Sequence, residues 1–114
     1  MKITHKQKND IVFFELSGEI DFQNSPALRD RLQEAVRTQI RGLVVNLKKV
    51  SYIDSSGLAT FVEALQKVKR YNGRLVLVEL GPAVRSVFEI AKLDSVFSLA
   101  ASEEEALQMF AASQ

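Results

Sequence analysis

The residues with the clearest chemical potential in this sequence are an aspartate, two serines and a glycine in one run. Asp54, Ser55, Ser56 and Gly57 follow an apolar segment and precede a segment whose apolar residues have helical spacing. Free backbone N–H groups and the positive end of a helix dipole gather at such a helix start. A phosphate on a serine hydroxyl would be tolerated there and would add about two negative charges to the surface.

The same run is also a good helix-capping sequence, which is its simplest structural explanation. One capping side chain is enough, however, and here three candidates stand in a row. The run also lies where a parallel strand is expected to end, the place at which α/β proteins put their ligand sites. Both observations favour a functional loop over a purely structural one.

The other reactive side chains do not support an enzyme site. A serine nucleophile needs a base, and the one histidine, His5, lies near the N-terminus in an expected edge strand. The chain has no cysteine, which removes disulfides, thiol chemistry and the usual structural zinc ligand. Asp21 and Asp54 alone make a weak metal pair, and the scattered glycines form no phosphate-binding motif. We expect no catalytic residue, no metal and no cofactor.

The composition is typical of an ordinary globular domain. The chain has 114 residues, 46% of them hydrophobic and 25% charged, with a formal net charge of +1. This balance gives no electrostatic case for nucleic-acid or membrane binding. No apolar run approaches the ~20 residues of a membrane helix, and the start lacks a signal-peptide pattern. We expect one cytoplasmic domain over residues 1–114, with no nucleic-acid partner and no membrane insertion.

Alternating strand-like and helix-like segments predict the fold. Two strand-like segments separated by a short polar turn predict an antiparallel hairpin at the N-terminus. Strands and helices alternate after it, which predicts parallel strands joined by right-handed crossovers. We expect strands at 2–7, 11–17, 43–47, 74–80 and 96–99, and helices that begin at Ser25-Pro26, near Ser56, at Gly81-Pro82 and near Ser102. The prediction is an α/β domain with a mixed, mostly parallel sheet and about four helices.

Capping residues predict where the helices begin and end. Ser25 is expected as the N-cap of the first helix, and Gly42 as the residue that stops it. Asn72 and Gly73 are expected to end the second helix, since they tolerate a positive φ angle. These boundaries put the aspartate–serine run at the N-terminus of the second helix.

Several segments together resemble the STAS family, and more narrowly its free-standing bacterial anti-sigma factor antagonists. The resemblance covers nearly the whole chain and rests most on the run from Val50 to Leu58. It also rests on Gly18-Glu19-Ile20-Asp21, on Leu47, on Asn72-Gly73 before a strand, and on Pro82-Ala83-Val84 before a helix that carries Phe88.

The resemblance implies a partner switch. In the family, the unphosphorylated antagonist binds an anti-sigma factor that is also a serine protein kinase, and so frees the sigma factor. That kinase phosphorylates the antagonist with ATP and the complex breaks, until a metal-dependent serine phosphatase restores it. The resemblance thus implies a STAS domain that is a binding protein and not an enzyme. Nothing in the sequence demands a dimer, and we expect a monomer.

The resemblance also implies roles for individual residues. The family's modified hydroxyl directly follows the motif's aspartate, which corresponds to Ser55, with Ser56 as the alternative. Asp21 matches the aspartate of the family's Gly-Glu-hydrophobic-Asp loop. The residues expected to bind the partner are Asp21, Phe22, Asp54, Ser55, Ser56, Gly57 and Leu58. For Phe22 two placements stay open: a core position, which the usual partition of phenylalanine favours, and an exposed docking anchor.

A second function stays open beside the sigma-factor switch. STAS-like domains also serve as binding subunits of lipid-transport ABC systems and of secretion or signalling switches, without sigma-factor control. The motif does not separate these roles. In either role, a phosphate buried at a docking surface without a dedicated cation costs several kcal/mol, and ~1.4 kcal/mol is a tenfold change in affinity.

Overall fold

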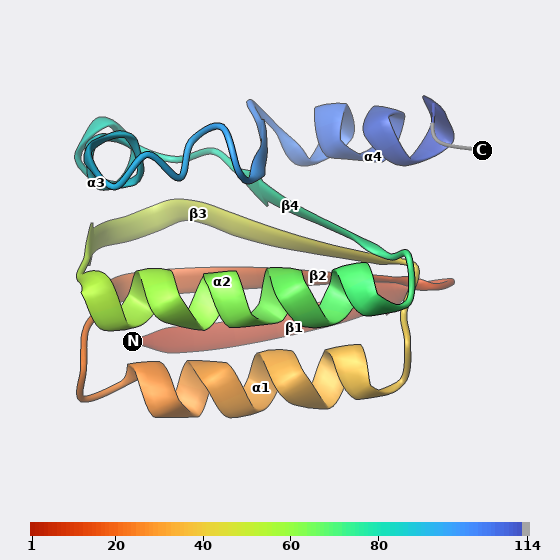
Figure 1. Cartoon of the computed structure of the whole chain (residues 1–114), viewed down its shortest axis with the longest axis horizontal. Helices are drawn as coiled ribbons and strands as arrows, with labels where there is room; N and C mark the ends of the chain where they lie inside the picture. Colours follow the sequence, from red (N-terminus) through yellow and green to blue (C-terminus); the bar gives the residue numbers. More distant parts are fainter. Residues whose placement is uncertain (113–114) are drawn as a thin grey trace.

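The protein, described over residues 1–112 by a computed structural model, consists of one five-stranded sheet and four helices (Figure 1). The strands are β1 (Lys2–Lys8), β2 (Ile11–Ile20), β3 (Gly42–Ile53), β4 (Arg74–Val78) and β5 (Ser98–Ala100). The helices are α1 (Ser25–Arg37), α2 (Ser55–Arg70), α3 (Pro82–Ile90) and α4 (Glu103–Ala112). The strands lie in sequence order, with β1 antiparallel to β2 and all other neighbours parallel. The predicted α/β fold with an N-terminal hairpin is confirmed.

Apolar cores fill both faces of the sheet. The larger core lies under α1, α2 and α3, and Phe61 and Phe88 are fully buried in it. The smaller core lies between the other face and α4, which contributes Phe110. The first half of strand β3, residues 42–47, is almost entirely apolar because both of its faces are covered there. No helix within the described part of the chain is long and apolar enough to cross a membrane.

Helices α1 and α2 lie side by side on one face (Figure 1) and are joined by an ion pair. The guanidinium of Arg29 donates two hydrogen bonds to the carboxylate of Glu63, at 2.6 and 2.8 Å. The ammonium of Lys67 lies 3.4 Å from the same carboxylate. The Arg29 hydrogen bond is the main reason why the pKa of Glu63 falls to about 2. The pair links the two helices at the surface, above the core that they share.

Two strands run further than the sequence predicted. Strand β3 was expected to end at Leu47 but continues to Ile53, and β2 was expected to end at Ser17 but continues to Ile20. Their pairing persists through two register shifts, the second of which follows Gly18, whose φ is +102°. A pattern with period two does not survive such irregularities. The extension carries the ends of β2 and β3 to the same edge of the sheet.

The predicted boundaries of α1 are wrong at both ends. Ser25 is the first helical residue rather than the N-cap, because the chain has already turned at Asp21, whose carbonyl accepts from the N–H groups of Asn24 and Ser25. The helix ends at Arg37, and Gln39 takes the positive φ, at 56°. Gly42 therefore begins β3 instead of ending the helix.

Of the other predicted boundaries, those at the end of α2 and at the start of α4 agree with the structure, whereas β4 ends at Val78 instead of at the expected Leu80. Asn72 has a φ of 65° just after α2, as expected for a residue that ends a helix. At the start of α4 the hydroxyl of Ser102 accepts from the N–H of Glu105, at 3.1 Å. The last strand is shorter than expected and begins at Ser98, which leaves Val96 in the preceding turn.

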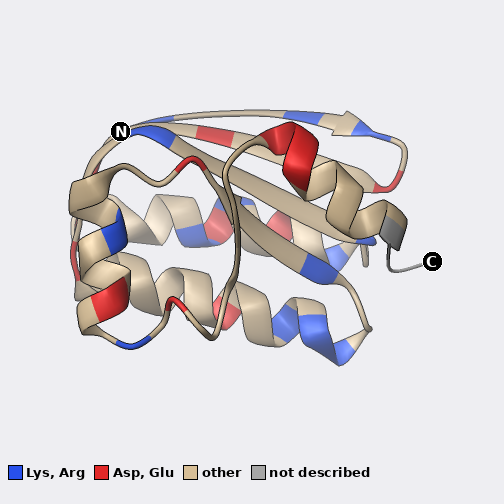
Figure 2. Cartoon of the chain, turned by 90° about the horizontal axis from the view of Figure 1, so that it is seen from above, with Lys and Arg blue, Asp and Glu red and all other residues tan. Residues whose placement is uncertain are grey.

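Strand β1 forms one edge of the sheet, and no other strand pairs with its outer side within residues 1–112. Its exposed residues include Lys2, Lys6 and Lys8. Figure 2 shows blue segments, which mark lysine and arginine, along this edge. The ammonium of Lys6 lies over the ring of Phe13, 5.6 Å from its centre. The edge is therefore polar and positively charged.

Candidate functional site

The aspartate–serine run lies at the edge of the sheet where the parallel strands end. Asp54 directly follows β3 and is the N-cap of α2, with extended backbone angles. Its backbone N–H donates to the carbonyl of Ile20, the last residue of β2, at 3.1 Å. Asp21 follows that residue, so the two aspartates, far apart in the sequence, come after two neighbouring strands. The structure thus brings together the two loops that the sequence singled out.

The carboxylate of Asp54 accepts four hydrogen bonds and joins these loops. Oδ1 accepts from the hydroxyl of Ser56 at 2.6 Å and from the backbone N–H groups of Ser56 and Gly57 at 3.0 and 3.1 Å. Oδ2 accepts from the backbone N–H of Phe22 at 3.1 Å. The hydrogen bond from the Ser56 hydroxyl is the largest of the effects that lower the pKa of Asp54 below its usual value. Asp54 is therefore an ionised cap at neutral pH.

This capping changes one expectation about the helix start. The sequence predicted N–H groups that a phosphate could use, but those of Ser56 and Gly57 already bind the Asp54 side chain. The N–H of Leu58 binds the Asp54 carbonyl at 3.1 Å. A phosphate at this position would therefore face solvent and the Asp54 carboxylate, with the helix dipole as its main favourable field.

The two serines differ in their surroundings. Ser55 is the first residue of α2, and its side chain is exposed. Its hydroxyl forms no hydrogen bond to another residue in the range 1–112. Ser56 is half-buried, and its hydroxyl donates to Asp54 and accepts from the hydroxyl of Ser25, at 3.2 Å. Of the pair, Ser55 presents the unoccupied oxygen.

Gly57 and Leu58 serve packing more than surface chemistry. A Cβ atom on Gly57 would lie 2.7 Å from side-chain carbons of both Ile20 and Ile53. The glycine therefore lets the first turn of α2 lie directly on the ends of β2 and β3. The side chain of Leu58 is buried in the larger core. Neither side chain adds much to the exposed surface around Ser55.

The loop between β2 and α1 is a tight turn with Phe22 at its tip. The Asp21 carboxylate accepts from the backbone N–H groups of Gln23 and Asn24 at 3.0 and 3.2 Å. The backbone N–H of Asp21 donates to Oδ1 of the Asn24 side chain at 2.9 Å. The side chain of Phe22 is 71% exposed, so the favoured core placement is wrong. These hydrogen bonds, with the one to Asp54, hold the Phe22 backbone against α2 and turn its ring to solvent.

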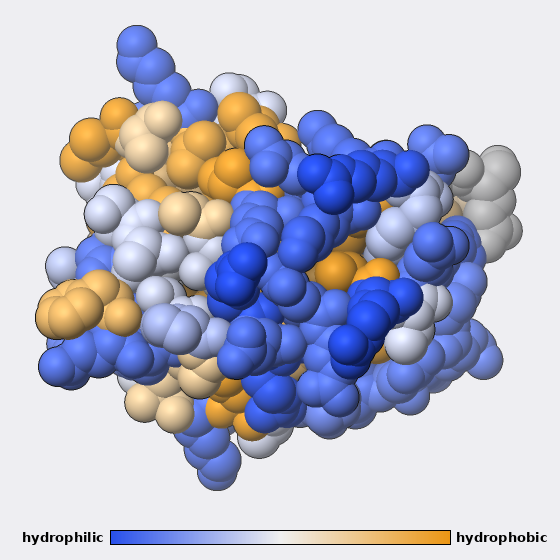
Figure 3. All heavy atoms as spheres, turned by 60° about the horizontal axis from the view of Figure 1, so that its bottom comes forward, coloured by the Kyte–Doolittle hydropathy of each residue, from blue (hydrophilic) through white to orange (hydrophobic). Residues whose placement is uncertain are grey.

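Further hydrophobic side chains are exposed around this end of the molecule. Figure 3 shows hydrophobic atoms gathered at its left end, the end at which α1 and α2 begin in Figure 1. Ile90, the last residue of α3, is 80% exposed, and Tyr52 near the end of β3 is half-exposed. The sequence pattern did not single out Ile90. Its position two residues after the buried Phe88 turns it by ~200° about the helix axis, to the opposite side, which the periodicity could have revealed.

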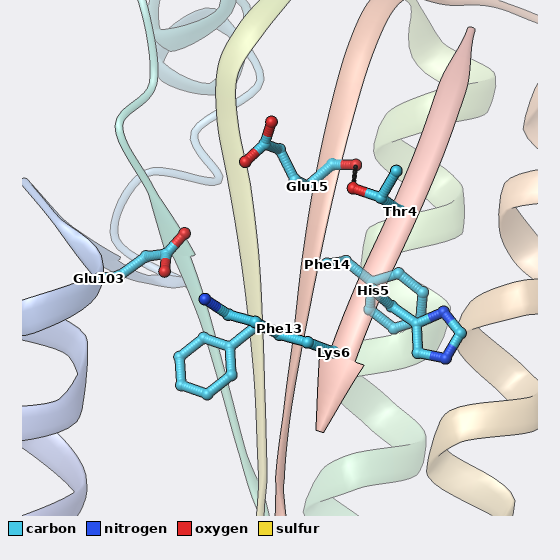
Figure 4. A pocket seen from close by; sticks show the side chains of 7 residues that line it. All are labelled: Thr4, His5, Lys6, Phe13, Phe14, Glu15 and Glu103. Atoms are coloured by element: carbon cyan, nitrogen blue, oxygen red, sulfur yellow. Dashed lines mark hydrogen bonds between the residues drawn. The ribbon is translucent and has the colours of Figure 1, made fainter. Parts of the chain in front are cut away.

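A small surface hollow lies away from this site, between the β1–β2 hairpin and the start of α4 (Figure 4). Lys6, Glu15 and Glu103 are among its lining residues, and none comes from the aspartate–serine run. The exposed His5 also lines the hollow, and the Nδ1 atom of His5 lies 2.8 Å from an Arg31 nitrogen.

Within residues 1–112 no group of three or more histidine or acidic side chains could hold a metal ion. The chemistry of the site is therefore that of the hydroxyls and carboxylates around Asp54.

Several known proteins are similar to this chain in sequence and in fold. Residues 2–106 match the family described as STAS domain. The anti-sigma-B factor antagonist of Bacillus subtilis is 34% identical over 103 residues, which cover 90% of this chain and 94% of that protein. The crystal structure of an anti-sigma factor antagonist from Mycobacterium paratuberculosis is 27% identical, with a TM-score of 0.87 over 95% of this chain and 92% of that chain. The unphosphorylated form of the anti-sigma factor antagonist SpoIIAA has the same fold, with a TM-score of 0.84 and 24% identity over 97% of each chain. The phosphorylated form of SpoIIAA from Bacillus also has this fold, with a TM-score of 0.75 and 23% identity over 96% of this chain and 99% of that chain.

Proposed function

The chain belongs to the STAS domain family, and from this premise we propose that it is an anti-sigma factor antagonist that works by partner switching. The unphosphorylated form binds an anti-sigma factor that is also a serine protein kinase, and the sigma factor is released. Phosphorylation on Ser55, with ATP as donor, reverses this binding, and a serine phosphatase restores it. The protein is a substrate and a ligand rather than a catalyst. It acts in the cytoplasm, as one domain over residues 1–114 and as a monomer.

The observation that carries this proposal is the state of the Ser55 hydroxyl. It stands exposed at the first position of α2 and forms no hydrogen bond within residues 1–112. The neighbouring Asp54 carboxylate is already occupied by the N–H groups and hydroxyl that it binds. A kinase can reach this oxygen without breaking a contact of the fold. Ser56 offers no such access, because its hydroxyl is bonded on both sides. The surroundings therefore support Ser55 as the acceptor.

Like-charge repulsion and desolvation explain how a phosphate would release the partner. The Asp54 carboxylate is ionised, and the N–H groups near it are already in use. A phosphate on Ser55 adds about two negative charges beside it, and these charges would have to lose water in a complex. Without a dedicated cation that loss costs several kcal/mol, which lowers affinity by orders of magnitude. No refolding of the antagonist is required.

The proposed partner surface combines this hydroxyl with apolar contacts. Phe22 and Ile90 are the two most exposed large hydrophobic side chains among residues 1–112. Aromatic and aliphatic anchors near the centre of an interface carry much of its binding energy. We propose that the partner covers Phe22, Asp21 and the start of α2. Ile90 would then lie at the rim of this interface.

The experiment is a pull-down from the source cells with the unphosphorylated chain, with and without ATP, followed by intact-mass measurement of both proteins. The proposal expects a captured ATP-binding serine kinase, a gain of one phosphate on the chain when ATP is added, and loss of the complex. Capture of an ABC ATPase, with no phosphate on the chain, would instead support the second role, that of a STAS subunit in a transport assembly.

A further inference from the structure

A chain of side-chain hydrogen bonds joins the first residues of α1 and α2 directly behind Ser55. The hydroxyl of Ser25 donates to the hydroxyl of Ser56 at 3.2 Å, and Ser56 in turn donates to Oδ1 of Asp54 at 2.6 Å. Oδ2 of Asp54 accepts from the backbone N–H of Phe22. The loop that leads into α1 is thus fastened to the start of α2 at two points.

Capping does not explain Ser25. The residue is buried, 6% exposed, although serine is usually a surface residue. Its hydroxyl accepts no hydrogen bond from the N–H groups of α1, which has no side-chain cap. Its partner in the structure is Ser56. A polar side chain buried at this position therefore acts on the neighbouring serine rather than on its own helix.

We propose that Ser25 determines which serine is phosphorylated, by keeping the Ser56 hydroxyl engaged. This inference rests on the proposed function, because it concerns the same kinase reaction. In that reaction the serine Oγ forms a bond to the γ-phosphorus of ATP while the bond from that phosphorus to the β,γ-bridging oxygen breaks. ADP leaves, and the hydroxyl proton passes to a base on the kinase.

The attacking oxygen must turn a lone pair toward the γ-phosphorus, in line with the leaving oxygen. Ser55 can do so, because its oxygen is exposed and accepts no hydrogen bond from the described part of the chain. The Ser56 hydroxyl is held in one orientation instead, because it donates its proton to Asp54 and one of its two lone pairs accepts from Ser25 on the side that faces α1. Successive residues of a helix are turned by ~100°, so the two hydroxyls already point in different directions. Ser25 holds the second one inward.

The test maps the phosphate in variants treated with ATP and the serine kinase that phosphorylates the wild-type chain. Ser55→Ala is expected to take up no phosphate. Ser55→Ala combined with Ser25→Ala is expected to be phosphorylated on Ser56, at a rate roughly tenfold or more above the detection limit that bounds the rate of Ser55→Ala alone. In Ser25→Ala with Ser55 intact, tandem mass spectrometry is expected to find part of the phosphate on Ser56.

Thr60→Val is the matched control. Thr60 is buried, and its hydroxyl donates to the backbone carbonyl of Ser56 at 2.9 Å. The variant removes a hydrogen bond to the backbone of Ser56 but leaves the Ser56 side chain bonded to Ser25 and Asp54. In the Ser55→Ala background, Ser56 is therefore expected to stay unphosphorylated. Ser25→Thr keeps a hydroxyl and is expected to restore the wild-type pattern. If Ser25→Ala loses its fold in thermal melts, Ser25→Cys replaces it, since a thiol fills similar space but donates weakly.

The outcomes separate this inference from the proposed function. If Ser55→Ala and the double variant with Ser25→Ala are phosphorylated on Ser56 to the same extent, the role of Ser25 is overturned. This holds both when neither variant takes up phosphate on Ser56 and when both do. The same holds if Thr60→Val exposes Ser56 as well as Ser25→Ala does. A wild-type chain that no associated kinase phosphorylates overturns the proposed function instead.

Discussion

The backbone N–H of Phe22 donates to Oδ2 of Asp54 at 3.1 Å, and this bond ties the most exposed aromatic ring to the cap of α2. The other oxygen of the same carboxylate holds the first turn of the helix. One side chain therefore sets the relative position of the proposed docking anchor and the proposed acceptor serine. Its loss would disturb both at once.

We predict that Asp54→Ala lowers the free energy of unfolding by about 0.5–2 kcal/mol, the usual cost of losing an N-cap. The variant also frees the loop that carries Phe22, so hydrogen exchange of the Phe22 amide is expected to become faster. Urea denaturation and exchange measured by NMR check the two effects. Asp94→Ala, at an exposed turn, is the control and is expected to change neither. An unchanged exchange rate in Asp54→Ala would contradict the coupling of the two loops.

We predict that stability falls in acid partly through Glu63. Its folded-state pKa is lowered from 4.5 to about 2, chiefly by the hydrogen bond from Arg29. A lowered carboxyl pKa gives stability that is fully present above the unfolded value of about 4.5 and is lost as pH falls towards 2. Glu63→Gln is expected to flatten the pH dependence of the free energy of unfolding over this range. The effect is modest, because the pair is partly exposed. An unchanged slope would show that the pair adds no pH-dependent stability.

We predict that Phe22→Ser lowers affinity for the partner kinase roughly tenfold or more without changing the thermal midpoint. The ring is 71% exposed, so its removal takes little from the core. Leu107→Ser is the control, since this partly exposed residue lies on α4, on the opposite face of the sheet from α2. Isothermal titration calorimetry measures both affinities. Equal affinities would remove Phe22 from the proposed interface.

We predict that Ser55→Asp weakens binding to the same partner roughly tenfold or more, while Ser55→Ala keeps it. The new carboxylate lies beside the ionised Asp54 and must lose water in the complex. Asn9→Asp adds the same charge in the hairpin turn at the far end of β2, and it is expected to bind as the wild type does. If Asn9→Asp weakened binding as much as Ser55→Asp, the effect would be one of net charge and not of position.

We predict that Gly57→Ala lowers the free energy of unfolding by about 1–3 kcal/mol through overpacking. The added methyl group would lie 2.7 Å from carbons of Ile20 and Ile53, so the start of α2 must move outward. Gly81→Ala is the matched control, since no atom outside its immediate neighbours lies within 4 Å of the position of its Cβ. Thermal and urea denaturation of the two variants give the comparison. Equal stabilities would mean that the first turn of α2 adjusts freely.

Local chemistry predicted the order and type of the elements well. A period of two, a period near 3.6 and turn residues such as Asn72 depend on neighbours in the chain, and the structure agrees with them. The full length of β3 depends instead on pairing with β2 through two register shifts, which no local pattern records. The predicted end of the strand at Leu47 was therefore short by six residues.

The site was predicted in outline, because the residues that form it lie in two short runs. The placement of Phe22 and the role of Ser25 could not be predicted from the sequence, because both depend on contacts between those runs. The backbone of Phe22 binds Asp54 while its ring is exposed, and Ser25 is buried with its hydroxyl bonded to Ser56. The polar type of Ser25 predicted a cap, whereas its role depends on a residue far away in the sequence. Such pairs become visible only once β2 and β3 end together.

The lysines of the edge strand β1 bear on how the protein behaves when it is concentrated. Two copies of β1 paired antiparallel about His5 would place Lys2 opposite Lys8 and Lys6 opposite Thr4, with like charges facing each other at both ends. Open edges without such charges recruit further strands and lead to aggregation. The charge pattern of β1 therefore opposes edge-to-edge self-association.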